Sequence, residues 1–249
     1  MAWLTLRNPA RLNAVRLEMW EAIPGALAPL AAHPDVRVVV MRGHGEQAFA
    51  SGADISEFQE RRSDPRQAAA YEEVTARAFE ALVHFEKPLV AMIHGVCIGG
   101  GLAIAASADL RIAAEDARLA LPPARLGIGY HMSGVERIVS IVGPSAASEI
   151  FFTARQYTAP EALRIGLVNQ VVPKADLQAF AEKYAAGIAA NAPLTLRAAK
   201  RAIRETQRDA ASRDHEAVRR LIAACFSSQD YAEGVRAFLE KRAPRFRGA

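Results

Sequence analysis

Three consecutive glycines, Gly99, Gly100 and Gly101, stand between two apolar runs of the chain. The run before them, Leu89–Ile93, predicts a buried strand, and the run after them predicts a buried helix that starts at Gly100 or Gly101. Glycine lets another group approach the main chain closely, and a helix start leaves N–H groups without partners. Such donors can hold a negatively charged oxygen. Close packing of the turn explains the glycines equally well, because a glycine run alone is a weak motif.

Side chains that could transfer protons follow the glycine run. His131, in the glycine-rich segment 126–131, could act as a base near neutral pH or be a solvated loop residue. Glu149 has apolar neighbours, which predicts a buried and paired carboxylate with a structural role. The chain shows no cluster of His, Asp, Glu and Cys with the spacing of metal ligands, so we expect no metal site.

The elements that must position these residues follow one order. Short strands alternate with helices up to about residue 172, and only helices are predicted after Pro173. We therefore expect an α/β core over residues 1–190 and an α-helical region over residues 191–249. In the core, residues 16–30 have the apolar spacing of a helix, although Pro24 should kink or interrupt it. The polar stretch that begins at Asp64 should be a mobile loop that enters a helix near Ala68.

Composition excludes several classes of protein. The chain has 249 residues, of which 51% are hydrophobic, and its formal net charge is +4. Its two cysteines lie far apart, which argues against a disulfide framework and suits a reducing compartment. No signal peptide and no apolar run long enough to span a membrane are evident, so a cytoplasmic protein is expected. The basic residues between 197 and 208 could be a solvated face, or could contact the phosphates of a ligand or a neighbouring subunit. Nucleic-acid binding is disfavoured because no aromatic residues are interleaved with them.

Four stretches of the chain together resemble the crotonase (enoyl-CoA hydratase/isomerase) superfamily. The stretches are 8–14 (NPARLNA), 49–55 (FASGADI), 95–101 (GVCIGGG) with Asp109 after it, and 158–168 (TAPEALRIGLV). The tail 230–242 is similar to the closing segment of that family. The resemblance implies a spiral of repeated ββα units and homotrimers, often paired into hexamers. It also implies an acyl-CoA thioester substrate, with no separate cofactor because CoA is part of the substrate.

The resemblance places an oxyanion hole at the N–H groups of Ala53 and Gly100. Two such donors stabilise the negative oxygen of a thioester enolate, typically by about 3–4 kcal/mol for each donor. Asp54 would cap the helix that follows Ala53 and so hold that N–H in place, or it is simply a helix cap. By the same resemblance, substrate-binding positions are expected at Arg11, Leu12, Ser51, Asp54, Ile55, Gly99 and His131.

The sequence departs from the family at both glutamates that hydratases use to hold and activate water. Ala103 and Pro123 stand at those positions, and neither residue can transfer a proton. A decarboxylase branch that acts on methylmalonyl-type CoA has a tyrosine where this chain has Tyr130, and also a proline where this chain has Pro123. That branch differs in having a histidine where this chain has Ala53 and an acid where it has Ala103.

Several functions therefore remain open at this stage. A hydratase or isomerase with another acid–base group, a decarboxylase that uses Tyr130, another enolate-forming lyase and a non-catalytic CoA-thioester-binding protein all fit. Tyr130 itself could instead be hydrogen-bonded at the rim of a pocket. The segment 61–77 is expected to form part of the acyl pocket, but its sequence does not reveal the acyl group.

Overall fold

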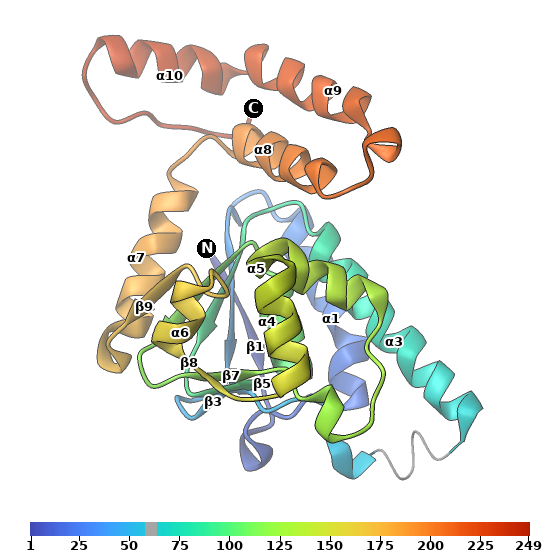
Figure 1. Ribbon diagram of the computed structural model, residues 1–249. Coiled ribbons are helices and arrows are strands. Elements are labelled where there is room, and N and C mark those ends of the chain that lie inside the picture. Colours follow the sequence, from blue (N-terminus) through green and yellow to red (C-terminus); the bar gives the residue numbers. More distant parts are fainter. Residues whose placement is uncertain (58–63) are drawn as a thin grey trace.

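The computed structural model describes residues 1–57 and 64–249 and shows an α/β body with a layer of helices above it (Figure 1). A five-stranded sheet in the order β1-β2-β4-β6-β9 is parallel throughout. Its strands are β1 (Ala2–Leu6), β2 (Val39–Gly43), β4 (Leu89–Ile93), β6 (Leu110–Ala114) and β9 (Gln170–Val172).

A second, four-stranded sheet runs in the order β3-β5-β7-β8, and β7 and β8 form its antiparallel pair. Its strands are β3 (Ala48–Ala50), β5 (Val96–Ile98), β7 (Arg118–Ala120) and β8 (Tyr157–Thr158). The first sheet is apolar because it is covered on both faces, and every residue of β4 is buried.

The chain builds these two sheets by repeating one unit. Each unit adds one strand to the first sheet, one strand to the second sheet and then a helix. The units are β2-β3-α3, β4-β5-α4 and β6-β7-α5, with helices α3 (Pro65–His84), α4 (Gly100–Ser107) and α5 (Met132–Thr153). The predicted spiral of ββα units is therefore confirmed.

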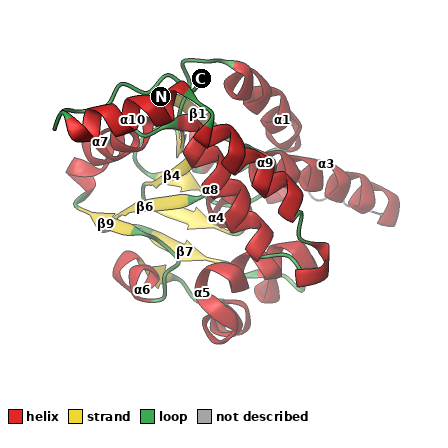
Figure 2. Cartoon of the chain, turned by 90° about the horizontal axis from the view of Figure 1, so that it is seen from above, coloured by secondary structure: helices red, strands yellow, loops and turns green. Residues whose placement is uncertain are grey.

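Helices pack on both sides of the five-stranded sheet. On the outer face, α7 (Leu177–Ala189) buries Leu177, Ala181 and Ala185 against strand residues such as Val90 and Ile112. The inner core lies between the sheets and α1 (Leu17–Ala32), α3 and α4, and the short helix α6 (Ala159–Arg164) follows β8. Figure 2 shows the strands enclosed by these helices.

Two sequence predictions for the helices near the site need correction. Helix α1 continues through Pro24 without interruption, because its buried residues Trp20, Ile23 and Leu27 hold it on the core. Helix α3 begins at Pro65, and the Asp64 side chain caps it by accepting from the N–H groups of residues 66 and 67, so no loop extends to Ala68. Residues 61–63 of the expected acyl-pocket segment lie outside the described residues.

The C-terminal helices α8 (Pro193–Thr206), α9 (His215–Phe226) and α10 (Gln229–Leu239) lie above the α/β body (Figure 1). Basic side chains of α8 hold this layer to the body. Lys200 Nζ lies 2.6 Å from Asp109 Oδ2, Arg204 Nη2 donates to Phe85 O at 2.6 Å, and Arg197 pairs with Glu86. The basic residues of this stretch are therefore largely engaged within the chain. Among the helices of the described residues, none is long and apolar enough to cross a membrane.

Candidate active site

The turn from β5 into α4 has a backbone shape that favours glycine. Gly99 adopts φ 53° and ψ −122°, a combination that L side chains rarely reach. Its N–H donates to Ala120 O of β7 at 2.8 Å, which joins the turn to the second sheet. The start of α4 is therefore fixed to β7 by a main-chain bond.

The next two glycines serve different purposes. A Cβ on Gly101 would lie 2.3 Å from Ala50 O, so close packing against β3 explains this glycine. A Cβ on Gly100 would lie 3.1 Å from Trp20 Cζ2 and 3.3 Å from Ala53 N. Close packing therefore explains Gly101. Gly100 instead lies close to the main-chain nitrogen of Ala53, which precedes it by 47 residues in the sequence.

Ala53 is held by a parallel bridge to Val15 that leaves its own N–H unused. Val15 N donates to Gly52 O at 2.7 Å, and Asp54 N donates to Val15 O at 3.0 Å. The N–H groups of Ala53 and Gly100 have no acceptor within the described ranges. Both residues keep partial exposure although Gly52, Asp54, Gly101 and Leu102 are buried. Two partly exposed residues whose N–H groups have no acceptor in the described chain therefore lie close to each other.

Asp54 fixes the turn that follows Ala53. Its carboxylate is buried and accepts from Ser56 N at 3.1 Å and from Ser56 Oγ at 2.7 Å. Burial raises the pKa of this carboxyl, but the Ser56 hydrogen bonds and the charges of Arg11 and Arg16 outweigh it, so the pKa lies below its usual value. The carboxylate lies at the start of a 3-10 turn, Ile55–Glu57, and residues 58–63 after this turn lie outside the described residues.

The remaining N-terminal residues of the expected substrate site lie together around this turn. Ser51 N donates to Leu12 O, and Ser51 Oγ donates to Arg11 O, each at 3.0 Å. Arg11 Nη1 lies 3.2 Å from Asp54 Oδ1. Leu12 and Ile55 leave 40% and 63% of their area exposed. The fold thus joins two segments about 40 residues apart into one surface beside Ala53.

The positions of the two family glutamates carry no titratable side chain in the structure. Ala103 lies on α4 and Pro123 begins a 3-10 turn, Pro123–Arg125, after β7, and both are half-buried. Tyr130 follows on the segment that leads into α5. Its ring packs 5.1 Å from the ring of Phe151, and burial raises the pKa of its phenol to about 12. Tyr130 is therefore a neutral hydrogen-bond donor at physiological pH.

His131 is exposed and its ring lies near α3. The side chain is 69% exposed, and its Nε2 lies 3.6 Å from Glu72 Oε1 on α3. The contacts of Tyr130 and His131 are with α5 and α3. No hydrogen bond, ion pair or ring contact joins either residue to Ala53 or Gly100 in the described chain. A substrate-binding role for His131 stays a prediction.

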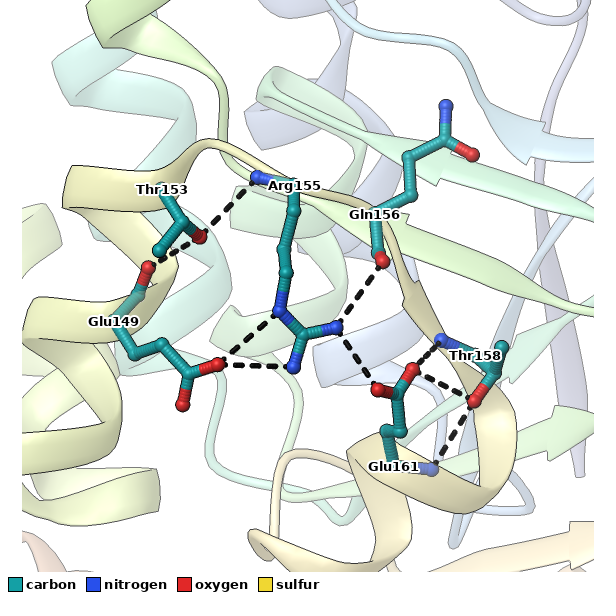
Figure 3. A network of polar contacts seen from close by, with 6 residues as sticks. All are labelled: Glu149, Thr153, Arg155, Gln156, Thr158 and Glu161. Atoms are coloured by element: carbon teal, nitrogen blue, oxygen red, sulfur yellow. Dashed lines mark hydrogen bonds and ion pairs between the residues drawn. The ribbon is translucent and has the colours of Figure 1, made fainter.

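Glu149 belongs to a polar network at the end of α5, drawn in Figure 3. Arg155 lies between two carboxylates, at 2.9 Å from Glu149 and 2.9 Å from Glu161. Glu161 in turn accepts from Thr158 N and Oγ1, which completes the predicted capping box of α6. Glu149 is paired as predicted, but at 47% exposure it is not buried.

Sequence reasoning missed three side chains that surround α4. Trp20 packs against Gly100, while its indole N–H is buried without a partner in the described residues. Arg137 and Arg111 bind main-chain carbonyls at the opposite end of the helix. Trp20 was predicted only as part of an apolar helix face, and isolated arginines in two distant elements carried no signal. Within the described ranges, no three His, Cys, Asp or Glu side chains are grouped to hold a metal ion.

Comparison with known proteins decides the family. The family model for enoyl-CoA hydratase/isomerase matches residues 1–249. The chain belongs to the enoyl-CoA hydratase/isomerase family. A short-chain-enoyl-CoA hydratase from Clostridium acetobutylicum is 35% identical over 246 residues, which cover 97% of this chain and 92% of that protein. The crotonase resemblance read from the sequence is thereby confirmed.

Two further proteins are similar to this chain over nearly its whole length. A methylmalonyl-CoA decarboxylase from Escherichia coli is 31% identical over 241 residues, covering 96% of this chain and 91% of that protein. The crystal structure of an enoyl-CoA hydratase/carnithine racemase from Magnetospirillum magneticum superposes with a TM-score of 0.94 at 35% identity, and covers 99% of this chain and 92% of that one. The family thus includes relatives named for hydration and for decarboxylation, and the fold is that of the crotonase family.

Proposed function

We propose that this chain is an enzyme that acts on an acyl-CoA thioester and stabilises its enolate with the N–H groups of Ala53 and Gly100. The observation that carries the proposal is that these two N–H groups have no acceptor in the described chain and lie close together, since a Cβ on Gly100 would be 3.3 Å from Ala53 N. Preorganised donors of this kind contribute most where negative charge develops in the transition state. Small residues at both positions let a thioester approach the main chain.

The surface beside Ala53 supports CoA as the carrier of the acyl group. Arg11 presents a guanidinium that is 56% exposed, and Leu12 and Ile55 present apolar side chains. A cationic group suits the phosphates of a nucleotide carrier, and the exposed apolar side chains suit its less polar parts. Arg11, Leu12, Ser51, Asp54, Ile55 and Gly99 are the residues we assign to substrate binding.

Of the reactions that pass through such an enolate, the residues at positions 103 and 123 best support one that needs no carboxylate base. Ala103 and Pro123 cannot remove a proton from carbon or activate water. In decarboxylation of a malonyl-type thioester, the bond between the α-carbon and the carboxylate breaks and CO₂ leaves. The electron pair of that bond moves to the enolate, whose oxygen the two N–H groups stabilise, and a proton then adds to the α-carbon.

Tyr130 is our candidate for the residue that orients the carboxylate or supplies that proton. Its high pKa keeps the phenol protonated, and its hydroxyl has no hydrogen-bond partner elsewhere in the described chain. If Tyr130 donates the proton, the phenolate formed recovers one from water. Hydration or isomerisation would instead require a different acid–base group at the site.

Turnover assays with two substrates test the function. We expect CO₂ release from methylmalonyl-CoA or ethylmalonyl-CoA and slow or no loss of the crotonyl-CoA double bond. Fast hydration of crotonyl-CoA would replace the decarboxylase proposal with a hydratase. Binding of both thioesters without turnover would indicate a CoA-thioester-binding protein that has lost its catalytic acids.

A substitution at Tyr130 then tests its role. Tyr130→Phe removes only the hydroxyl, and loss of a proton donor should lower kcat by roughly 100-fold. Tyr184→Phe is the matched control, because Tyr184 stacks on Phe180 in α7 on the outer face of the five-stranded sheet. If the Tyr130→Phe rate equals that of the control, Tyr130 does not take part in the reaction.

We also propose that region 191–249 assembles the chain into a homotrimer or a hexamer. Helix α9 buries no residue, and its Phe226 is 64% exposed, while Phe238 and Leu239 at the end of α10 are 83% and 75% exposed. Exposed apolar side chains grouped on neighbouring helices typically mark an interface. Light scattering after size exclusion should give three or six times 26.9 kDa, and a monomer would contradict the proposal.

A further inference from the structure

Helix α4 is short and uncharged, yet charged side chains surround its C-terminal end. Gly100–Ser107 has eight residues, which corresponds to about 12 Å of helix. Arg137 of α5 donates from Nε to Ala106 O at 2.6 Å and from Nη2 to Ala108 O at 2.9 Å. Arg111 of β6 donates from Nη1 to the same Ala108 O at 2.8 Å. Two guanidinium groups from separate elements therefore meet at one helix end.

This arrangement costs more than an ordinary helix C-terminus. Arg111 is 4% exposed and Arg137 is half-buried, and burial lowers the pKa of both groups. The charge of Arg137 also lowers the pKa of Arg111, whereas the charge of Asp109 raises the pKa of both groups. Neither guanidinium contacts a carboxylate within the described residues; the further hydrogen bonds go to Leu167 O and, at 3.5 Å, to Gln207 Oε1. A glycine cap would satisfy such carbonyls without burying a cation.

We infer that Arg137, together with Arg111, is a positioning residue that fixes α4 along its axis and thereby sets the place of the Gly100 N–H. The inference rests on the proposed oxyanion hole. At the N-terminal end of α4, Gly101 packs against Ala50 O and Gly100 packs against Trp20. These contacts limit sideways motion of the helix. The guanidinium bonds to Ala106 O and Ala108 O limit sliding from the rear. A short helix moves as one body, so a shift at its end moves the donor.

The expected consequence is catalytic rather than only structural. A donor misplaced by about 1 Å can cost up to 100-fold in rate. A cation at the C-terminal end also stabilises the helix, because the helix dipole is negative at that end. Loss of Arg137 should therefore weaken the hydrogen bonding to the thioester carbonyl oxygen and leave binding of the CoA part unchanged.

The test follows the thioester carbonyl directly. Butyryl-CoA labelled with ¹³C at the carbonyl is bound to the wild-type protein, to Arg137→Gln and to Arg204→Gln, and its stretching band is recorded by difference infrared spectroscopy. Arg204 is the matched control, because its partly buried guanidinium also donates to a main-chain carbonyl, Phe85 O, but at the docking surface of α8.

We expect the bound wild-type band to lie below its position in solution, and Arg137→Gln to move it back towards that position. The kcat on the substrate that is turned over should fall about tenfold with KM within twofold, which corresponds to about 1.4 kcal/mol. Arg204→Gln should behave as wild type. The inference would be overturned if the carbonyl band in Arg137→Gln stays at its wild-type position, or if both variants shift the band and lower kcat equally.

Two outcomes separate this inference from the proposed function. If the wild-type protein does not move the band at all, the oxyanion hole itself is wrong. If Arg137→Gln does not fold, Arg137→Lys takes its place in the test. A single ammonium cannot hold both carbonyls in the fixed geometry of a guanidinium, so an intermediate band is expected, and a wild-type band would again overturn the inference.

Discussion

The two ends of α4 differ in the hydrogen bonding of their main-chain polar groups. At the C-terminal end, Ala106 O and Ala108 O receive three hydrogen bonds from two arginines. At the N-terminal end, the N–H groups of Gly100 and of nearby Ala53 have no acceptor in the described chain. The fold thus brings cations to one end and leaves donors open at the other.

This difference indicates where a ligand is expected. Main-chain N–H groups at a helix start that have no acceptor within the chain can bind a negatively charged oxygen. Three experiments test the contrast between the two ends, from the largest expected effect to the smallest.

The largest effect is expected where the front of α4 meets β3. Gly101→Ala places a Cβ 2.3 Å from Ala50 O, and because both groups belong to fixed main chain, we expect a loss of at least about 3 kcal/mol in the free energy of unfolding. Urea titration measures this loss. Gly187→Ala is the control: no atom lies within 4 Å of its added Cβ, so stability should stay equal or rise.

One residue earlier, the same substitution should act on activity more than on stability. In Gly100→Ala the new methyl group lies 3.3 Å from Ala53 N and 3.1 Å from Trp20 Cζ2. The methyl group occupies the volume between the two donors, so kcat/KM should fall about 100-fold while the free energy of unfolding falls by only about 1–2 kcal/mol. Wild-type activity in this variant would show that no oxyanion binds there.

The smallest effect concerns the residue just after the rear of α4, where Asp109 pairs with Lys200. Burial lowers the pKa of Lys200 to about 8, below its value in an unfolded chain. Above about pH 8 the unfolded chain therefore holds a proton that the folded chain has released, and raising the pH favours folding. From pH 8 to pH 10, the free energy of unfolding of the wild type should rise relative to Lys200→Met by on the order of 1 kcal/mol.

Chemical denaturation at several pH values checks this difference. Lys200→Met keeps the length of the apolar stem and removes the titrating group. A difference between the two proteins that stays constant from pH 8 to pH 10 would show that Lys200 titrates far above pH 8. The interaction with Asp109 would then outweigh the cost of burial.

Particular residues show how far sequence reasoning reached. The apolar run 89–93 predicted β4, and the capping box at Thr158 predicted the start of α6, because both signals are local. The prediction for Pro24 was partly wrong, because packing of α1 on the core outweighs the proline penalty. Residues 197–208 suggested a solvated or ligand-binding face, whereas Lys200, Arg204 and Arg197 dock α8 onto the body.

The sequence by itself determined the order of strands and helices, the family and the absence of glutamates at 103 and 123, because these properties depend on residue types and local spacing. Only the tertiary structure decided how closely Gly100 lies to Ala53 N and that Arg111 and Arg137 meet behind the same helix. Hydrogen bonding between groups far apart in the chain depends on how the sheets bring strands together. Residue types and their local spacing do not specify that arrangement.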